Sequence, residues 1–171
     1  MTIYRFENKS PIIRQTTYVH PQASIIGDVE IADHCFIGAG AVLRGDFGSI
    51  RIGAGTCVQD NCVIHVGIEG MVSIAENVII AHGAILHDVI IKPYVLIGMG
   101  SILMTGVSCQ DHVMIAAGSV VKENFHIASH MVVAGNPARI IKPLSNEQKN
   151  RIIEGIKTYQ DLTKRYKKSD G

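Results

Sequence analysis

The residues of this chain best suited to chemistry are three closely spaced histidines, His65, His82 and His87. Histidine is the commonest metal ligand in proteins, and three converging imidazoles can hold a zinc ion with its fourth position open. An ion held in this way activates a bound water molecule at neutral pH. The spacing of the three residues does not by itself bring them together, so the elements that would position them come first.

Large aliphatic residues recur every six positions through most of the sequence, and we call these positions anchors. The pattern is interrupted by three extra residues, then by four extra residues, and finally by one missing residue. All nineteen anchors are aliphatic or cysteine: Val19, Ile25, Ile31, Ile37, Leu43, Ile52, Val58, Ile64, Ile74, Ile80, Leu86, Ile91, Ile97, Leu103, Cys109, Ile115, Val121, Ile127 and Val133. The residue four positions after an anchor is often small or β-branched, as in Ala23, Cys35 and Ala84.

A period of six fits neither an α-helix nor a two-sided strand, but it is typical of a hexapeptide β-helix. Each hexapeptide forms a short strand and a corner, and three of them complete a triangular coil whose axis is filled by the anchors. The anchors predict an all-β fold of about six to seven parallel coils, stacked about 4.8 Å apart. An antiparallel sandwich is the alternative, and so many anchors in register argue against it.

After Val133 the Asn136-Pro137 pair ends the repeat, and Ser145 begins a capping-box pattern, S-N-E-Q. Apolar residues then recur at helical spacing between lysines and arginines, which predicts an amphipathic helix over 144–168, lying against the coils or against a neighbouring subunit. We expect a lead-in over 1–18 and the β-helix over 19–138, all in a single domain.

The composition of the chain limits its domain number, its binding partners and its cellular location. The chain has 171 residues, of which 47% are hydrophobic and 5% aromatic, and 17 are glycine, which favours one domain with a narrow interior. A formal net charge of +1 gives no electrostatic case for nucleic acid or an anionic membrane surface. Without a run able to span a bilayer, and without the apolar core of a signal peptide in MTIYRFENKSPIIRQ, we expect a cytoplasmic protein.

The four cysteines have no CxxC spacing, which argues against a zinc knuckle or a redox motif. Cys35 and Cys62 fall at small inward positions and Cys109 at an anchor, so we expect these three to fill the core. Cys57 precedes an anchor, and the sequence suggests no role for it.

The repeat assigns the three histidines to two different places on the coils. His65 and His87 each follow an anchor of the same wall, as does Arg44, so the three should form a column with the two imidazoles one strand spacing apart. His82 follows an anchor of another wall, with Asp60 directly below it and Gln59 beside that aspartate.

Five residues separate His82 from His87, roughly 16 Å of extended strand, so one chain cannot complete a three-histidine site. A threefold homotrimer would place one column against the other column of the next subunit. That assembly contains three equivalent sites at three interfaces. The remaining histidines are expected to be solvated surface residues: His20, His34, His112, His126 and His130.

Five motifs resemble the gamma-class carbonic anhydrases, and among them the small bacterial phenylacetate-degradation and carnitine-operon hexapeptide proteins most closely. The resemblance covers residues from about 10 to 140. Its motifs are RGD-x-x-x-I at 44–50, VQD at 58–60, AHGAILH at 81–87, LIGMGS at 96–101 and AGNPAR at 134–139.

The resemblance implies a left-handed β-helix, a homotrimer, and a zinc ion, or Fe²⁺ in some members, bound by His65 and His87 of one subunit and His82 of its neighbour. It implies hydration of carbon dioxide to bicarbonate, because the metal lowers the pKa of bound water to near 7.

The resemblance also assigns roles to other residues. Gln59 would orient the attacking hydroxide, while Arg44 and Asp60 would pair across the interface with support from Asp46. A purely structural trimer contact is the alternative for these charged residues. Tyr159 loosely matches a family tyrosine near the metal, and helix packing is its alternative role.

Two positions depart from the well-studied carbonic anhydrases. Phe47 stands where the family archetype has a glutamate, and the short stretch VGIEGMVS replaces an acidic loop that carries a second glutamate. Both glutamates are associated with proton shuttling. Glu69 in the short loop could substitute, although a solvated loop charge is the simpler interpretation.

Two other functions stay open at this point. One is acyl transfer or thioester hydrolysis on coenzyme A, as in a hexapeptide acyltransferase or an acyl-CoA thioesterase. Hexapeptide acyltransferases use the same kind of fold with a histidine base, and their coenzyme sites usually involve basic residues on the later coils, where this chain has Lys92 and Lys122. The third possibility is a catalytically weak trimeric scaffold that the metal holds together.

Overall fold

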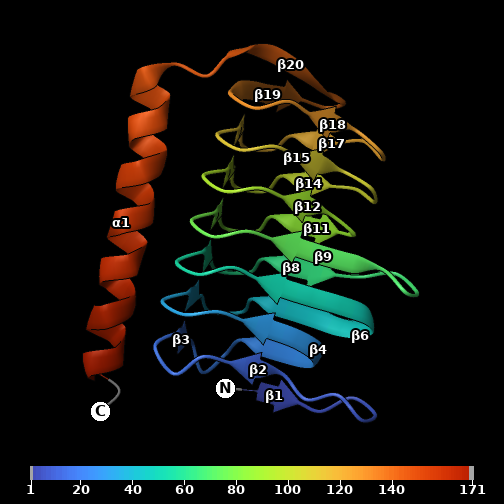
Figure 1. Ribbon diagram of the computed structural model, residues 1–171, viewed down its shortest axis with the longest axis vertical. Helices are drawn as coiled ribbons and strands as arrows, with labels where there is room; N and C mark the ends of the chain where they lie inside the picture. The colour runs from blue at the N-terminus through green and yellow to red at the C-terminus, as the bar shows by residue number, and fades with distance from the viewer. Residues whose placement is uncertain (1, 170–171) are drawn as a thin grey trace.

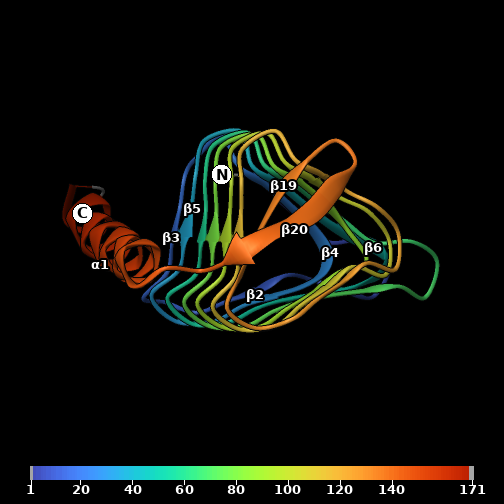
Figure 2. The ribbon, with the colours of Figure 1, turned by 90° about the horizontal axis from the view of Figure 1, so that it is seen from above.

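The computed structural model describes residues 2–169 and shows a parallel β-solenoid of about seven turns with one C-terminal helix (Figure 1). Seen along the stacking axis, successive coils lie over one another and enclose a single narrow interior (Figure 2). This architecture is consistent with the left-handed hexapeptide β-helix. The all-β fold class and the number of coils predicted from the anchors are confirmed.

The strands form three walls, all paired in parallel except at the top. Wall 1 contains the first halves of β4 (Ser24–Ile31) and β6 (Val42–Ile52), with β1 (Thr2–Tyr4), β8 (Val63–His65), β11 (Ile85–His87), β14 (Ile102–Leu103) and β17 (Val120–Val121). Wall 2 contains the second halves of β4 and β6, with β2 (Ile12–Ile13), β9 (Met71–Ile74), β12 (Ile90–Ile91), β15 (Ser108–Cys109) and β18 (His126–Ile127).

Wall 3 is a separate sheet. Its parallel strands are β3 (Tyr18–Val19), β5 (Phe36–Ile37), β7 (Cys57–Val58), β10 (Ile79–Ile80), β13 (Leu96–Ile97), β16 (Met114–Ile115) and β19 (Met131–Gly135). The strand β20 (Ala138–Pro143) turns back and pairs with β19 in antiparallel fashion, which ends the parallel stack.

The anchors fill the interior as the repeat predicts. On wall 1, Leu43, Ile64 and Leu86 are partners in adjacent strands, and all three are fully buried. Every other anchor is buried too except Val19, which is partly buried and packs against the same core. Because each coil contributes one anchor per wall, the hydrophobic register dictates how the strands pair and therefore where every surface residue lies.

Three corners join the walls, and they hold the polar residues of interest. Corner A joins walls 1 and 2 and follows Arg44, His65 and His87. Corner B joins walls 2 and 3, and corner C joins wall 3 to the next coil's wall 1. Corner B is built from residues in the left-handed region of φ: His34, Asn77, Tyr94, His112 and His130.

The extra residues in the repeat all extend corner A. The first insertion lengthens β6 so that it runs through the corner from wall 1 to wall 2, and the second forms the loop 66–70 that precedes β9 and projects from the solenoid (Figure 1). The lead-in also joins the stack, because β1 and β2 pair with β4.

The helix α1 (Asn146–Ser169) runs down the length of wall 3 from the top coil to the bottom one (Figure 1). It starts with the predicted capping box, since Ser145 Oγ accepts a hydrogen bond from the Gln148 backbone N–H and the Gln148 side chain accepts one from that of Ser145. Its residues Ile152 and Ile156 are buried against wall 3. Within residues 2–169 no helix is both long and apolar enough to cross a membrane.

Candidate metal centre

His65 and His87 are direct partners on neighbouring strands of wall 1. β8 and β11 pair in the register that sets Leu86 over Ile64 and His87 over His65. The two imidazole rings lie with their centroids 5.1 Å apart and inclined at 71°. Arg44 is the partner of His65 one coil below, so the column expected from the repeat is present in the fold.

Asp46 supports His65 from the coil below. The Asp46 carboxylate lies 3.1 Å from His65 Nε2 through Oδ1 and 2.5 Å from the Arg44 guanidinium through Oδ2. Burial alone would raise the pKa of Asp46, but the hydrogen bonds from Arg44 and His65 outweigh it and hold that pKa below its usual value. Asp46 is therefore an anion that can fix the tautomer and orientation of His65.

His87 is held by two residues that sequence reasoning missed. Its Nδ1 lies 3.0 Å from Asp88 Oδ2 and 3.1 Å from Thr105 Oγ1. The Asp88 carboxylate also accepts the backbone N–H of Gly67, which ties the projecting loop to this histidine. The adjacency of Asp88 to His87 was a usable signal, whereas Thr105 is brought there only by the stacking of coils.

His82 lies on corner C, where Asp60 is its neighbour one coil below. His82 Nδ1 lies 3.3 Å from Asp60 Oδ2, and the His82 backbone N–H donates to Gln59 Oε1 over 3.2 Å. The Gln59 side chain is buried at 6% exposure, and its amide nitrogen faces Cys57 Sγ at 3.9 Å. Within one chain, Gln59 therefore positions the backbone of His82.

The arrangement of the three histidines suits metal binding, but it is divided between two corners. Each ring has one nitrogen directed to a carboxylate, and among the described residues the other nitrogen has no hydrogen-bond partner. This is the pattern of metal-ligating histidines, whose second nitrogen is oriented by an outer carboxylate. Wall 1 separates His82 from His65 and His87, so one chain holds a pair of histidines at one edge of the wall and a single histidine at the other.

The outer face of wall 1 is apolar between these two edges. Five aliphatic residues stack there in register, four of them half-buried and Ile85 exposed: Val42, Val63, Ile85, Ile102 and Val120. The corresponding face of wall 3 is covered by α1, and that of wall 2 is mostly polar. An uncovered aliphatic column on a single wall is typical of a surface that a partner buries.

The two positions that depart from the carbonic anhydrase pattern lie beside His65. The ring of Phe47 is 54% exposed and its centroid lies 6.0 Å from that of His65. The Glu69 backbone N–H donates to the Phe47 carbonyl over 3.0 Å, and the Glu69 side chain is exposed. The short loop thus lies over the same edge of corner A as the histidine pair.

Tyr159 is placed on the inner side of α1. Its ring packs edge-on against Phe36 of wall 3, with centroids 5.4 Å apart. Burial raises the pKa of Tyr159, and the nearby Cys57 and Asp60 add to that effect. This contact corresponds to the helix-packing role.

Comparison with known proteins places these features in a family. Residues 10–45 match the family described as bacterial transferase hexapeptide (six repeats). The carnitine operon protein CaiE of Proteus sp. (strain LE138) is 39% identical, over 96% of this chain and 84% of that protein. The mitochondrial gamma carbonic anhydrase 2 of Arabidopsis thaliana is 40% identical over 94% of this chain, which spans only 60% of that relative's length.

A solved structure shows that the similarity holds for the three-dimensional fold as well as for the sequence. The hexapeptide transferase family protein of Anaplasma phagocytophilum superimposes with a TM-score of 0.92 and 32% identity, covering 96% of this chain and 98% of that one. The chain therefore belongs to the hexapeptide-repeat family that contains the gamma carbonic anhydrases and the carnitine operon protein CaiE.

Proposed function

We propose that this protein is a metal-dependent carbon dioxide hydratase, which forms bicarbonate at three-histidine sites between the subunits of a homotrimer. The observation that carries the proposal is the division of the histidines. A carboxylate-supported pair, His65 and His87, lies at one edge of an apolar wall, and His82 lies at the other edge. The relative at 40% identity from Arabidopsis thaliana is a gamma carbonic anhydrase, in keeping with this chemistry.

Wall 1 is the surface on which we expect the trimer to form. Burying the aliphatic column Val42, Val63, Ile85, Ile102 and Val120 against a neighbouring subunit removes exposed apolar surface, which favours association. Cyclic symmetry then brings corner A of one subunit to corner C of the next, three times in the closed ring.

At each proposed site the metal ion and the protein side chains would have different roles. A divalent ion such as Zn²⁺, or alternatively Fe²⁺, would act as a Lewis acid and lower the pKa of a bound water towards 7. Asp46 and Asp88 keep His65 and His87 in the tautomers that leave one ring nitrogen open. Asp60 does the same for His82.

Three further residues complete the proposed site. Gln59 fixes the backbone of His82 and would orient the attacking oxygen once a partner subunit closes the site. Arg44 would pair with Asp60 of the partner subunit in addition to the Asp46 that it contacts within its own chain. Glu69, on the loop above Phe47, is our candidate for transferring the released proton to solvent.

Subunit mixing tests the division directly. We expect His65→Ala and His82→Ala to be inactive and metal-poor when expressed alone. Co-expressed, each mixed trimer has one interface that joins an intact His65–His87 pair to an intact His82. Random assembly puts both variants in about three quarters of the trimers, so about a quarter of wild-type metal content and hydration rate should return.

A matched pair of variants controls this experiment. His65→Ala and His87→Ala both damage the same half-site, so their mixture should recover neither metal nor activity. Recovery in this control, or no recovery in the His65→Ala and His82→Ala mixture despite mixed trimers by native mass spectrometry, would contradict the interface site.

The same samples separate the competing functions. Return of metal without carbon dioxide hydration would support a metal-bound scaffold. Metal-independent turnover of an acyl-CoA by all three variants would support an acyltransferase or thioesterase, the reaction suggested by the transferase name of the Anaplasma phagocytophilum relative.

A further inference from the structure

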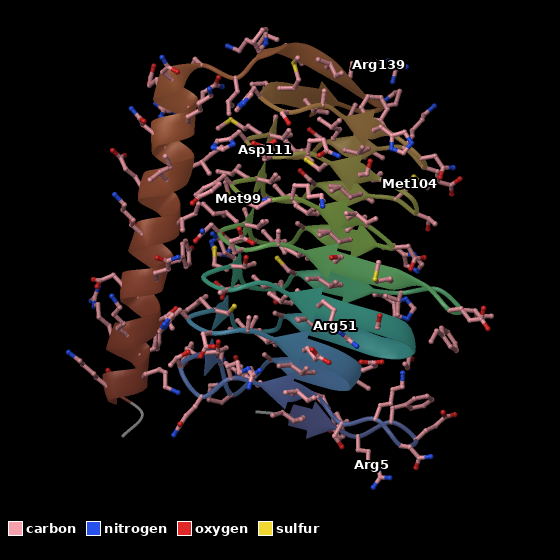
Figure 3. The ribbon with its side chains drawn as sticks, viewed as in Figure 1. Arg5, Arg51, Met99, Met104, Asp111 and Arg139 are labelled. Atoms are coloured by element: carbon pink, nitrogen blue, oxygen red, sulfur yellow. The ribbon has the colours of Figure 1, made fainter. Side chains whose placement is uncertain are left out.

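A second group of metal-ligating side chains lies on corner B, on the upper coils of the solenoid (Asp111 in Figure 3). Asp111, His112 and His130 each offer one ligand atom, and these atoms all lie within 4.8 Å of one another. His112 Nδ1 is 2.8 Å from Asp111 Oδ2, and the rings of His112 and His130 have centroids 5.0 Å apart. The sequence alone suggested that both histidines were merely solvated, and the fold instead groups them with a carboxylate.

The backbone holds this group in place. His112 and His130 occupy equivalent corner positions one coil apart, both with positive φ, at 55° and 63°. The His130 backbone N–H donates to the Asp111 carbonyl over 3.2 Å. Adjacent coils lie at the strand spacing, so two side chains that leave the same corner in the same direction must stay neighbours.

Two further contacts orient the side chains. The ring of Tyr94, one coil below, stacks on the ring of His112 with centroids 5.0 Å apart and planes inclined by only 20°. Ser129 Oγ donates a 2.5 Å hydrogen bond to Asp111 Oδ1, while Oδ2 contacts His112. Outer contacts of this kind typically orient the ligands of a metal.

We propose that Asp111, His112 and His130 form a second, structural binding site for a divalent transition-metal ion such as Zn²⁺. Two imidazoles and one carboxylate are a donor set that suits zinc and its first-row neighbours rather than calcium or magnesium, which prefer oxygen ligands only. Around a tetrahedral zinc, ligand atoms lie about 3.3 Å apart, so small side-chain rotations would close the site.

The corner B group is separate from the candidate metal centre. Wall 2 separates it from corner A, and wall 3 with the helix α1 lies between it and corner C. If wall 1 is the trimer interface, corner B faces away from the threefold axis and stays open to solvent. The proposed ion therefore needs no second subunit.

The position of this group suggests what the ion does. It would link the corner before β16 to the corner before β19, the last parallel strand of wall 3. The His130 carbonyl also accepts a 2.7 Å hydrogen bond from Leu144, just before the helix cap. A terminal coil has a neighbour on only one side, so fraying starts there, and a metal link would resist it.

Zinc titration of a chain that lacks the interface ligands tests the proposal. We expect His65→Ala/His82→Ala to bind one Zn²⁺ per chain by calorimetry and native mass spectrometry. Adding His130→Asn or Asp111→Asn should abolish that binding. Asparagine keeps the shape of Asp111 but not its charge, and at position 130 it tolerates the positive φ, as Asn77 does at the same corner.

The chain contains a matched control, because the dipeptide Asp33-His34 repeats Asp111-His112 at the same corner. His34 has a φ of 60°, and the corner residue one coil above it is Gly55 rather than a histidine. His34→Asn should therefore leave zinc binding unchanged.

Hydrogen exchange provides a second readout in case the His65→Ala/His82→Ala variant folds poorly. In otherwise wild-type protein, Zn²⁺ should slow hydrogen exchange in β19, β20 and the start of α1, and His130→Asn should remove that protection without lowering interface metal content. The proposal would be overturned if a folded His65→Ala/His82→Ala protein bound no zinc, if His34→Asn and His130→Asn lost zinc binding equally, or if hydrogen exchange in β19 did not depend on zinc.

Discussion

His87 lies directly over His65, with the imidazole centroids 5.1 Å apart, although the loop 66–70 and two further walls of the coil separate them in the chain. The pairing follows from the anchors beneath them, because Leu86 and Ile64 must share one layer of the core. Their carboxylate partners come from different places, Asp46 from the coil below and Asp88 from the next residue along the chain.

Asp88→Asn should weaken metal binding without unfolding the protein. The carboxylate orients His87 Nδ1 and accepts the Gly67 N–H, and losing such an outer partner typically costs about 10-fold to 100-fold in metal affinity. Competition with a chromophoric chelator measures the change. Thr105→Val, which removes only the 3.1 Å contact to the same nitrogen, should have the smaller effect, and the reverse order would show that Asp88 does not position His87.

Gly98→Ala should destabilise the solenoid far more than Gly100→Ala. A Cβ at Gly98 would clash with backbone atoms of Ala116 and Ala117 on the next coil, which side-chain rotation cannot relieve, so we expect a loss of about 3 kcal/mol. Gly100 has a φ of +65° and open space around a Cβ, so only the backbone cost of about 1 kcal/mol applies. Denaturant unfolding of both variants provides the comparison, and equal losses would refute this account of coil packing.

The cysteines should resist alkylation in the native protein. Burial raises the pKa of Cys35 and Cys62 to about 11 and that of Cys57 to about 12, so few thiolates form at pH 8, and all four side chains are buried. Mass spectrometry after iodoacetamide treatment should find no adduct at pH 8 and four adducts in guanidinium chloride. Rapid labelling of the native chain would show that the core opens.

Asp28 should contribute stability that disappears in acid. Burial opposes ionisation of Asp28, but hydrogen bonds from Lys9 and Arg51 outweigh it and lower its pKa. Because the folded pKa lies below the unfolded value of about 3.9, the contribution is complete above that value and is lost as the pH falls through the folded pKa.

The variant Asp28→Asn tests this prediction. It should lower the free energy of unfolding by only about 1 kcal/mol at pH 7, because Lys9, one of the two cationic partners of Asp28, is solvent-exposed. Urea unfolding at pH 7 and at pH 3 should show its difference from wild type shrinking in acid. Glu30 also contacts Arg51, at the longer distance of 3.5 Å, so the control variant Glu30→Gln should differ little from wild type at either pH. If the stability difference between Asp28→Asn and wild type widened in acid, the predicted direction of the pH dependence would be wrong.

The sequence alone was enough for the architecture, because the period of the anchors is a direct record of the strand register. Once Leu43, Ile64 and Leu86 occupy one wall, the alignment of Arg44, His65 and His87 follows. The same rule applied at a spacing of eighteen residues would have aligned His112 with His130, since eighteen residues make one uninterrupted coil.

Contacts that depend on side-chain rotation and on the insertions were decided only by the tertiary structure. Arg44 contacts Asp46 within its own chain because β6 carries the aspartate around corner A, and Thr105 reaches His87 only because two coils stack. The periodicity defines which wall and which height a residue occupies, but not where its functional atoms point. That last step depends on local packing, and it is what groups Asp111 with His112 and His130.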